Sequence, residues 1–161
     1  ALSGQEAARR LALGRAWALG NGLPVPGFVP PAWLINGVSL QAVEEAGFRY
    51  TCTRDEIVLL PGRRWLPGHT LVYSTRSAWR RVASLLWNAS RRGGAERAAL
   101  MRFELHPGDA DHAAVLRQWR TQLVQALRTR DAVRLVDVVT AARQASAGSG
   151  PAPPGNGPAR S

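Results

Sequence analysis

The sequence contains no lysine and only one cysteine, and the shortage of cysteine excludes two kinds of structural cross-link. Cys52 stands alone, so the chain has no internal disulfide and no zinc site built from cysteines. A protein without disulfides suits a reducing compartment, which predicts a cytoplasmic location. No apolar run approaches the roughly 18 residues of a membrane span. A membrane partner is therefore not expected.

Positive charge is carried by arginine alone, with 21 basic residues against 11 acidic ones and a net charge of +10. With 161 residues, 45% of them hydrophobic, the chain can bury the core of one domain. The arginines are scattered among glutamate and apolar residues, which favours a bias of composition over a nucleic-acid partner. The alternative is a basic module that binds an anionic polymer or surface. That module would gather five arginines on one face: Arg80, Arg81, Arg91, Arg92 and Arg97.

Hydrophobic spacing and turn residues predict alternating helices and strands. Helices are expected over 4–20, 39–47, 76–92 and 112–130, with Gly93-Gly94 ending the third and a further helix beginning within 132–139. Strands are expected over 23–30, 48–53, 70–74, 100–106 and 132–139, with a hairpin of 56–60 and 63–66 around Pro61-Gly62.

This alternation predicts an α/β domain over residues 1–144, built on a largely parallel sheet or barrel, with the hairpin as an insertion. Residues 145–161 are rich in Gly, Pro, Ser and Ala and are predicted to be a disordered tail. In the third helix, Trp79, Val82, Leu86 and Trp87 share one face.

Functional residues of α/β folds gather where the strands end, and two segments of this chain follow predicted strands. His106 follows "MRFEL" and precedes Pro107-Gly108, so its imidazole could exchange a proton near neutral pH or simply bond a loop carbonyl. Asp109 and Asp111 could ligate a metal or cap the next helix. No histidine spacing typical of a metal site is present, so none is predicted within the chain.

The other segment is "GFVPPAWLING", residues 27–37, in which two prolines and two glycines surround a tryptophan. Connecting loops more often use Asn, Asp, Ser and Gly. The composition indicates a stiff turn that holds Trp33 in one position. Trp33 could offer a flat platform to a sugar, or it could be an ordinary core residue.

Four segments in order carry a resemblance to a known family: "GFVPPAWL", "AVEEAGFRYTCT", "LVYSTRSAWRR" and "MRFELHPGDADHAAVLRQW". They resemble the C-terminal half of a divergent bacterial branch of the polysaccharide deacetylases, the metal-dependent carbohydrate esterase family 4. The resemblance implies a partial or distorted (β/α) barrel. It also implies hydrolysis of acetyl groups on a carbohydrate, with a divalent metal, zinc being expected, as cofactor.

The resemblance assigns His106 as the general acid and places Pro31, Trp33 and Asp109 at the substrate. It predicts that His106 and Trp33 share one pocket. The family's Asp-Asp pair and paired histidines have no counterpart here, and the resemblance places them upstream of Ala1. The metal ligands are therefore expected outside this chain, which alone should show little or no turnover.

The family's arginine in the Pro-Pro turn is also missing, since Phe28 and Val29 occupy that place. This departure leaves open a degenerate, non-catalytic fold, beside the basic binding module. The sequence leaves the substrate and the oligomeric state open.

Overall fold

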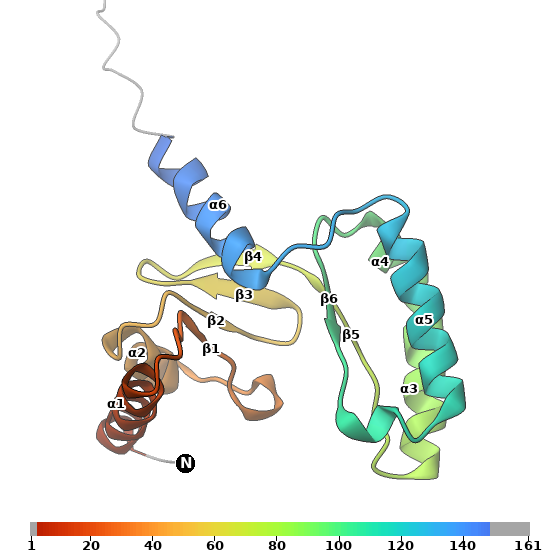
Figure 1. The fold of residues 1–161 in the computed structure, drawn as a ribbon, viewed down its shortest axis with the longest axis horizontal. Helices are drawn as coiled ribbons and strands as arrows, with labels where there is room; N and C mark the ends of the chain where they lie inside the picture. The colour runs from red at the N-terminus through yellow and green to blue at the C-terminus, as the bar shows by residue number, and fades with distance from the viewer. Residues whose placement is uncertain (1–2, 149–161) are drawn as a thin grey trace, which may run out of the picture.

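The computed structural model describes residues 3–148, which form a mixed α/β fold with two small sheets (Figure 1). The helices are α1 (Gly4–Gly20), α2 (Gly37–Glu45), α3 (Ala78–Ser90), α4 (Arg92–Arg97), α5 (Ala113–Leu127) and α6 (Leu135–Gly148), with short 3-10 turns η1 (Pro31–Trp33) and η2 (Pro107–Asp109). The strands are β1 (Gly27–Phe28), β2 (Tyr50–Cys52), β3 (Glu56–Leu59), β4 (Arg64–Pro67), β5 (His69–Val72) and β6 (Met101–Glu104).

The strands form two sheets instead of the single, largely parallel sheet that the sequence predicts. One sheet has the order β1-β2-β3-β4, with β1 parallel to β2 and antiparallel pairing thereafter. The other is the parallel pair β5-β6, in which His69 lies opposite Met101 and Val72 opposite Glu104. Among residues 3–148 the strands do not close into a barrel.

Helix α3 crosses from β5 to β6, and α5 returns beside it on the same side of that pair (Figure 1). Helices α1 and α2 pack together near the four-stranded sheet, and α6 lies against β3 and β4 (Figure 1). The parallel crossover and the antiparallel hairpin meander are thus separate parts of one chain.

Several predicted elements are confirmed with their expected end signals. Ser3 caps α1 by accepting a bond from the Glu6 amide, as its spacing predicts. Gly47 follows α2 with φ +78°, a conformation that glycine adopts without strain. The β3–β4 hairpin forms around Pro61-Gly62, and its tip is held by Glu44, which accepts a bond from the Gly62 amide at 3.2 Å.

Three predictions about element boundaries are wrong. Gly93-Gly94 does not break a helix, because both residues lie inside α4, which follows α3 after a single turn residue. Residues 132–134 form no strand, and α6 begins at Leu135 because Leu135, Val139 and Ala142 lie one turn apart and pack on the core. Helix α6 also continues past Ala145 to Gly148, and the remainder of the predicted tail lies outside the described residues.

The core consists of three apolar clusters. Leu40, Val43 and Phe48 of the α2 region meet Val58 and Leu60 from the hairpin. On the opposite side of the hairpin, Cys52, Ile57 and Leu59 meet Val139 from α6. The third cluster joins β5 to the two helices beside it and contains Leu71, Tyr73, Val115 and Trp119, with Leu85 and Phe103 at its margin.

Helix α3 presents its apolar face to solvent, which is the reverse of an ordinary surface helix. Trp79, Val82, Leu86 and Trp87 are all exposed. The face turned toward β5 carries Ser84 and Asn88 beside the apolar Leu85. No helix among the described residues is long and apolar enough to cross a membrane.

Candidate functional site

The turn after β1 holds two consecutive non-glycine residues in the left-handed region. Ala32 has φ +53° and Trp33 has φ +56°. The turn is closed by the Trp33 amide donating to the Pro30 carbonyl at 3.0 Å and the Leu34 amide donating to the Pro31 carbonyl at 3.2 Å. Such backbone costs on the order of 1 kcal/mol per residue and persists where the surroundings fix it. The "PPAW" segment is therefore a strained and defined turn, as its composition indicates.

Trp33 is fixed from the other sheet. Its indole Nε1 donates to Glu104 Oε1 at 3.3 Å, although the two residues are 71 positions apart. Glu104 ends β6, and His106 follows two residues later. This hydrogen bond brings the turn after β1 to the end of β6, which the sequence predicts for two segments at strand ends.

Strand β6 separates polar from apolar side chains by strict alternation. Phe103 faces the helices, where its ring lies 5.2 Å from the Trp119 ring of α5. Arg102 and Glu104 point the other way, toward the four-stranded sheet, because Glu104 binds Trp33 of η1 and Arg102 binds the turn after β2. His106 follows two residues after β6 and has an extended backbone, with φ −96° and ψ 148°.

Arg102 joins the two sheets. It is buried, and its guanidinium donates to the Thr53 carbonyl at 2.7 Å, to the Arg54 carbonyl and to Thr70 Oγ1 on β5 at 2.6 Å. Thr70 Oγ1 donates in turn to the Arg54 carbonyl. No carboxylate forms an ion pair with Arg102 among the described residues. The carbonyl dipoles and the Thr70 hydroxyl stabilise the guanidinium, and these hydrogen bonds hold the β2–β3 turn against β5 and β6.

His106 is exposed, and its backbone is held by a buried carboxylate. The His106 amide donates to Asp109 Oδ2 at 3.1 Å, and the Asp109 amide donates back to the His106 carbonyl at 2.9 Å. Asp109 is completely buried, which differs from a residue that touches substrate at an open surface. It caps η2, whereas the next helix, α5, begins after His112. Asp111 does not cap α5 either.

The second carboxylate oxygen of Asp109 is buried without a hydrogen-bond partner. The neighbouring Gly108 lies beside Thr75, three residues after β5, and an added methyl group would come within 3.3 Å of Thr75 Oγ1. Among residues 3–148, however, no three His, Cys, Asp or Glu side chains converge on one point. The residues around His106 and Asp109 therefore do not form a binding site for the divalent metal of the polysaccharide deacetylases.

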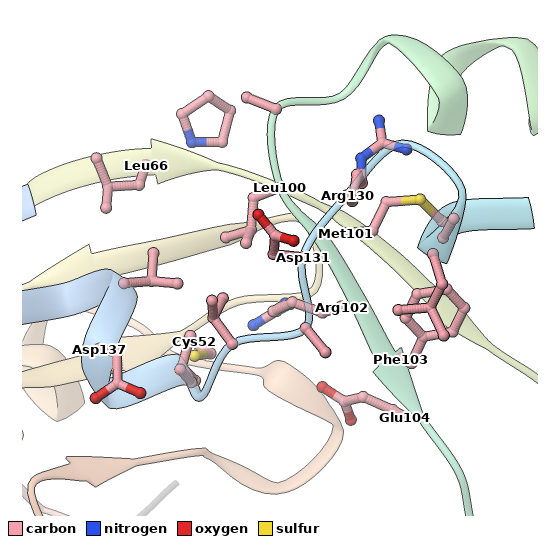
Figure 2. A pocket seen from close by; sticks show the side chains of 18 of the residues that line it. Cys52, Leu66, Leu100, Met101, Arg102, Phe103, Glu104, Arg130, Asp131 and Asp137 are labelled. Atoms are coloured by element: carbon pink, nitrogen blue, oxygen red, sulfur yellow. The ribbon is translucent and has the colours of Figure 1, made fainter. Parts of the chain in front are cut away.

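A cavity of about 1080 Å³ opens beside β6, bounded by the end of α5, the linker 128–134 and α6 (Figure 2). Its walls are mainly apolar. The charged residues on its wall are Arg102, Glu104, Arg130, Asp131 and Asp137. Neither Trp33 nor His106 lines it. The predicted common pocket is therefore not this cavity, and the Trp33–Glu104 bond is the contact that joins the two segments.

Cys52 also lines this cavity, on the four-stranded sheet. Burial raises the pKa of its thiol, Arg102 opposes that shift and Glu104 adds to it. The thiol is therefore held in its neutral form at neutral pH, and Cys52 behaves as a small core residue.

The remaining predicted site residue, Pro31, is exposed at the first position of η1 and starts the left-handed turn. The sequence interpretation missed Arg102 and Glu104. Their signal is the alternation in "MRFELH", because a strand buried on both faces would be continuously apolar. Comparison of the chain with protein-family models, with curated proteins and with solved structures finds no match.

Proposed function

We propose that this chain supplies the sugar platform and the proton donor of a polysaccharide deacetylase-like hydrolase. The observation that supports the proposal is the hydrogen bond from Trp33 to Glu104, which couples the strained turn to the strand leading to His106. An aromatic ring in a fixed orientation can stack on one face of a pyranose ring. The proposal includes the distorted barrel of that family, a carbohydrate substrate and a cytoplasmic location.

In this proposal each residue of the candidate site has a separate role. Trp33 orients the sugar, and Glu104 fixes the indole. Deacetylation breaks an acyl–nitrogen or acyl–oxygen bond after water attacks the carbonyl, and the departing amine or alkoxide needs a proton. His106 supplies that proton from a ring N–H, because its imidazole is exposed at the end of β6. Asp109 holds the His106 backbone by its amide and so acts as a positioning residue.

A metal in the resembled family polarises the carbonyl and activates the water. The residues described here do not form that metal site, so no step is derived through it. The chain alone is expected to bind the sugar without turning it over, and the test measures binding.

The test titrates the protein with an oligomer of N-acetylglucosamine and follows binding by calorimetry. Trp33→Leu should weaken binding about tenfold, equivalent to about 1.4 kcal/mol. Trp65→Leu is the matched control, because Trp65 is an exposed tryptophan on β4. His106→Asn should leave binding unchanged, because His106 acts on the leaving group and not on the bound sugar.

Equal losses in the Trp33 and Trp65 variants, or no binding by the unaltered chain, would overturn the proposal. The non-catalytic alternative differs in a second measurement. If the chain is joined with the metal-binding half of such an enzyme, His106→Asn should abolish hydrolysis, whereas a non-catalytic fold would show no hydrolysis to lose.

A further inference from the structure

The outward apolar face of α3 is a surface that the proposed hydrolase site does not use. We define the α3 apolar face as Trp79, Val82, Leu86 and Trp87. Their side chains are 68%, 55%, 66% and 52% exposed. The two tryptophans lie about 12 Å apart along the helix axis, with the aliphatic residues between them.

The inward face of α3 is fixed, so the helix cannot rotate to bury these residues. Asn88 is buried and its side-chain amide donates to the Val72 carbonyl of β5 at 2.9 Å. Ser84 Oγ accepts from the Ser74 amide at 3.2 Å. Leu85 packs in the cluster with Leu71 and Trp119. Turning α3 over would break these hydrogen bonds and remove Leu85 from its cluster.

The same segment concentrates the positive charge of the protein. Residues 76–97 contain six arginines and one acidic residue, Glu96, a net of +5 out of +10 for the whole chain. Two arginines border the α3 apolar face directly. Arg80 lies 5.2 Å from the Trp79 ring centre, and Arg91 lies 5.6 Å from that of Trp87. Arg91 also reaches Asp55 at 3.9 Å.

We propose that the α3 apolar face docks on the surface of a bilayer that contains anionic phospholipids. A helix with tryptophan and leucine on one face and arginine at its borders matches the lipid interface, where indole rings sit at headgroup depth and guanidinium groups meet phosphates.

Charge favours this occupant over two others. A second copy of the chain would bring two arginine-rich segments together and would add repulsion to the contact. A nucleic acid would satisfy the arginines but would leave Val82 and Leu86 against water. Surface docking needs no spanning helix. The proposal therefore departs from the sequence-based expectation of no membrane partner, which rests on the absence of a span.

The test measures co-flotation of the full chain with vesicles of phosphatidylcholine, with and without phosphatidylglycerol. Binding is expected only with phosphatidylglycerol, with a blue shift of tryptophan fluorescence and a decline as salt is raised. Arg80→Gln with Arg91→Gln should weaken binding about thirtyfold, from about 1 kcal/mol for each arginine near an anionic surface.

Trp79→Ala with Leu86→Ala should remove binding, and both sites are exposed, so the fold should be retained. The matched control is Trp17→Ala on α1. Trp17 is 67% exposed, like Trp79, but two of the three arginines of α1, Arg9 and Arg10, are paired with Glu6. This control should bind like the unaltered protein.

Four results would overturn the proposal. The first is no binding to either vesicle. The second is an equal loss in the Trp17 variant. The third is a dimer in sedimentation that Trp79→Ala with Leu86→Ala dissolves, which would assign the face to a second copy. Binding to an oligonucleotide in preference to vesicles would equally count against it.

Discussion

The two sheets are built on opposite principles. In the four-stranded sheet, β3 is buried on both faces, since Ile57, Val58 and Leu59 each contact apolar residues. In the two-stranded sheet, β6 alternates, with Phe103 on the helices and Arg102 and Glu104 on the other side. The first sheet is stabilised by apolar packing on both faces. The second sheet has polar side chains on one face, and hydrogen bonds from that face hold it to the first sheet. This polar face can accommodate a functional site.

The largest expected effect comes from matched cavities in the two sheets. Ile57→Ala and Leu71→Ala each remove a side chain that is at most 1% exposed, and each should lower the free energy of unfolding by about 2–5 kcal/mol. We expect a difference in hydrogen exchange. Leu71→Ala should expose the β5 and β6 amides preferentially, because its cluster contains no residue of the four-stranded sheet.

Exposed Leu13 on α1 provides the control, and Leu13→Ala should change stability by less than about 0.5 kcal/mol. Uniform loss of protection across both sheets in Leu71→Ala would show one cooperative unit, and the contrast between the sheets would then have no energetic meaning.

The next effect concerns the link between the sheets. Arg102→Met keeps the aliphatic length but removes donors to the Thr53 and Arg54 carbonyls and to Thr70, and it should cost about 2–3 kcal/mol in chemical denaturation. Arg134→Met removes only an exposed pair with Asp137 and should cost less than about 0.5 kcal/mol. Equal costs for the two variants would mean that the buried guanidinium does not join the sheets.

The smallest effect is a pH dependence at the start of β5. Burial lowers the pKa of His69, nearby Arg91 and Arg54 lower it further, and Asp55 opposes them. In the unfolded chain the imidazole has its ordinary pKa near 6.5, whereas the pKa in the folded protein is lower. As the pH falls, the unfolded chain therefore binds a proton at His69 before the folded chain does. Stability should therefore decrease as the pH falls from about 7 toward 5.

His69→Gln should flatten this part of the stability–pH curve, measured by urea denaturation at each pH. His106→Gln is the comparison variant, because His106 is exposed on the surface. If both variants changed the curve alike, the burial of His69 would not be its cause.

Much of the fold was predictable where one short-range cause dominates. The cap at Ser3, the glycine after α2 and the Pro61-Gly62 hairpin all follow from local chemistry. The prediction that Gly93-Gly94 breaks a helix was wrong, because both glycines lie within the helical backbone of α4. The prediction of a strand within 132–139 was wrong because a short apolar run is compatible with a strand or a helix. Packing on the four-stranded sheet selects the helix.

The site was predictable at its ends and not at its centre. The strand-end rule identifies the turn after β1 and the end of β6, and the hydrogen bond from Trp33 to Glu104 joins these two segments. The roles of Trp33 and His106 remain a prediction. The role of Arg102 depends on two carbonyls of the turn after β2, a contact 48 residues away that no local pattern encodes. The outward direction of α3 likewise depends on Asn88 meeting β5, since helical periodicity defines a face but not the side to which it turns.

Helix α6 completes the core from the far end of the described chain. Val139 packs between Cys52, Ile57 and Leu59, and Arg143 donates to the Leu60 carbonyl. A ribosome adds roughly 5–20 residues per second, so the hairpin emerges on the order of ten seconds before the helix that covers it. During that interval one apolar side of the hairpin faces water. We therefore expect a chaperone that binds apolar strands to bind nascent chains of this protein. A stop codon placed before Leu135 should yield a product that proteases degrade quickly.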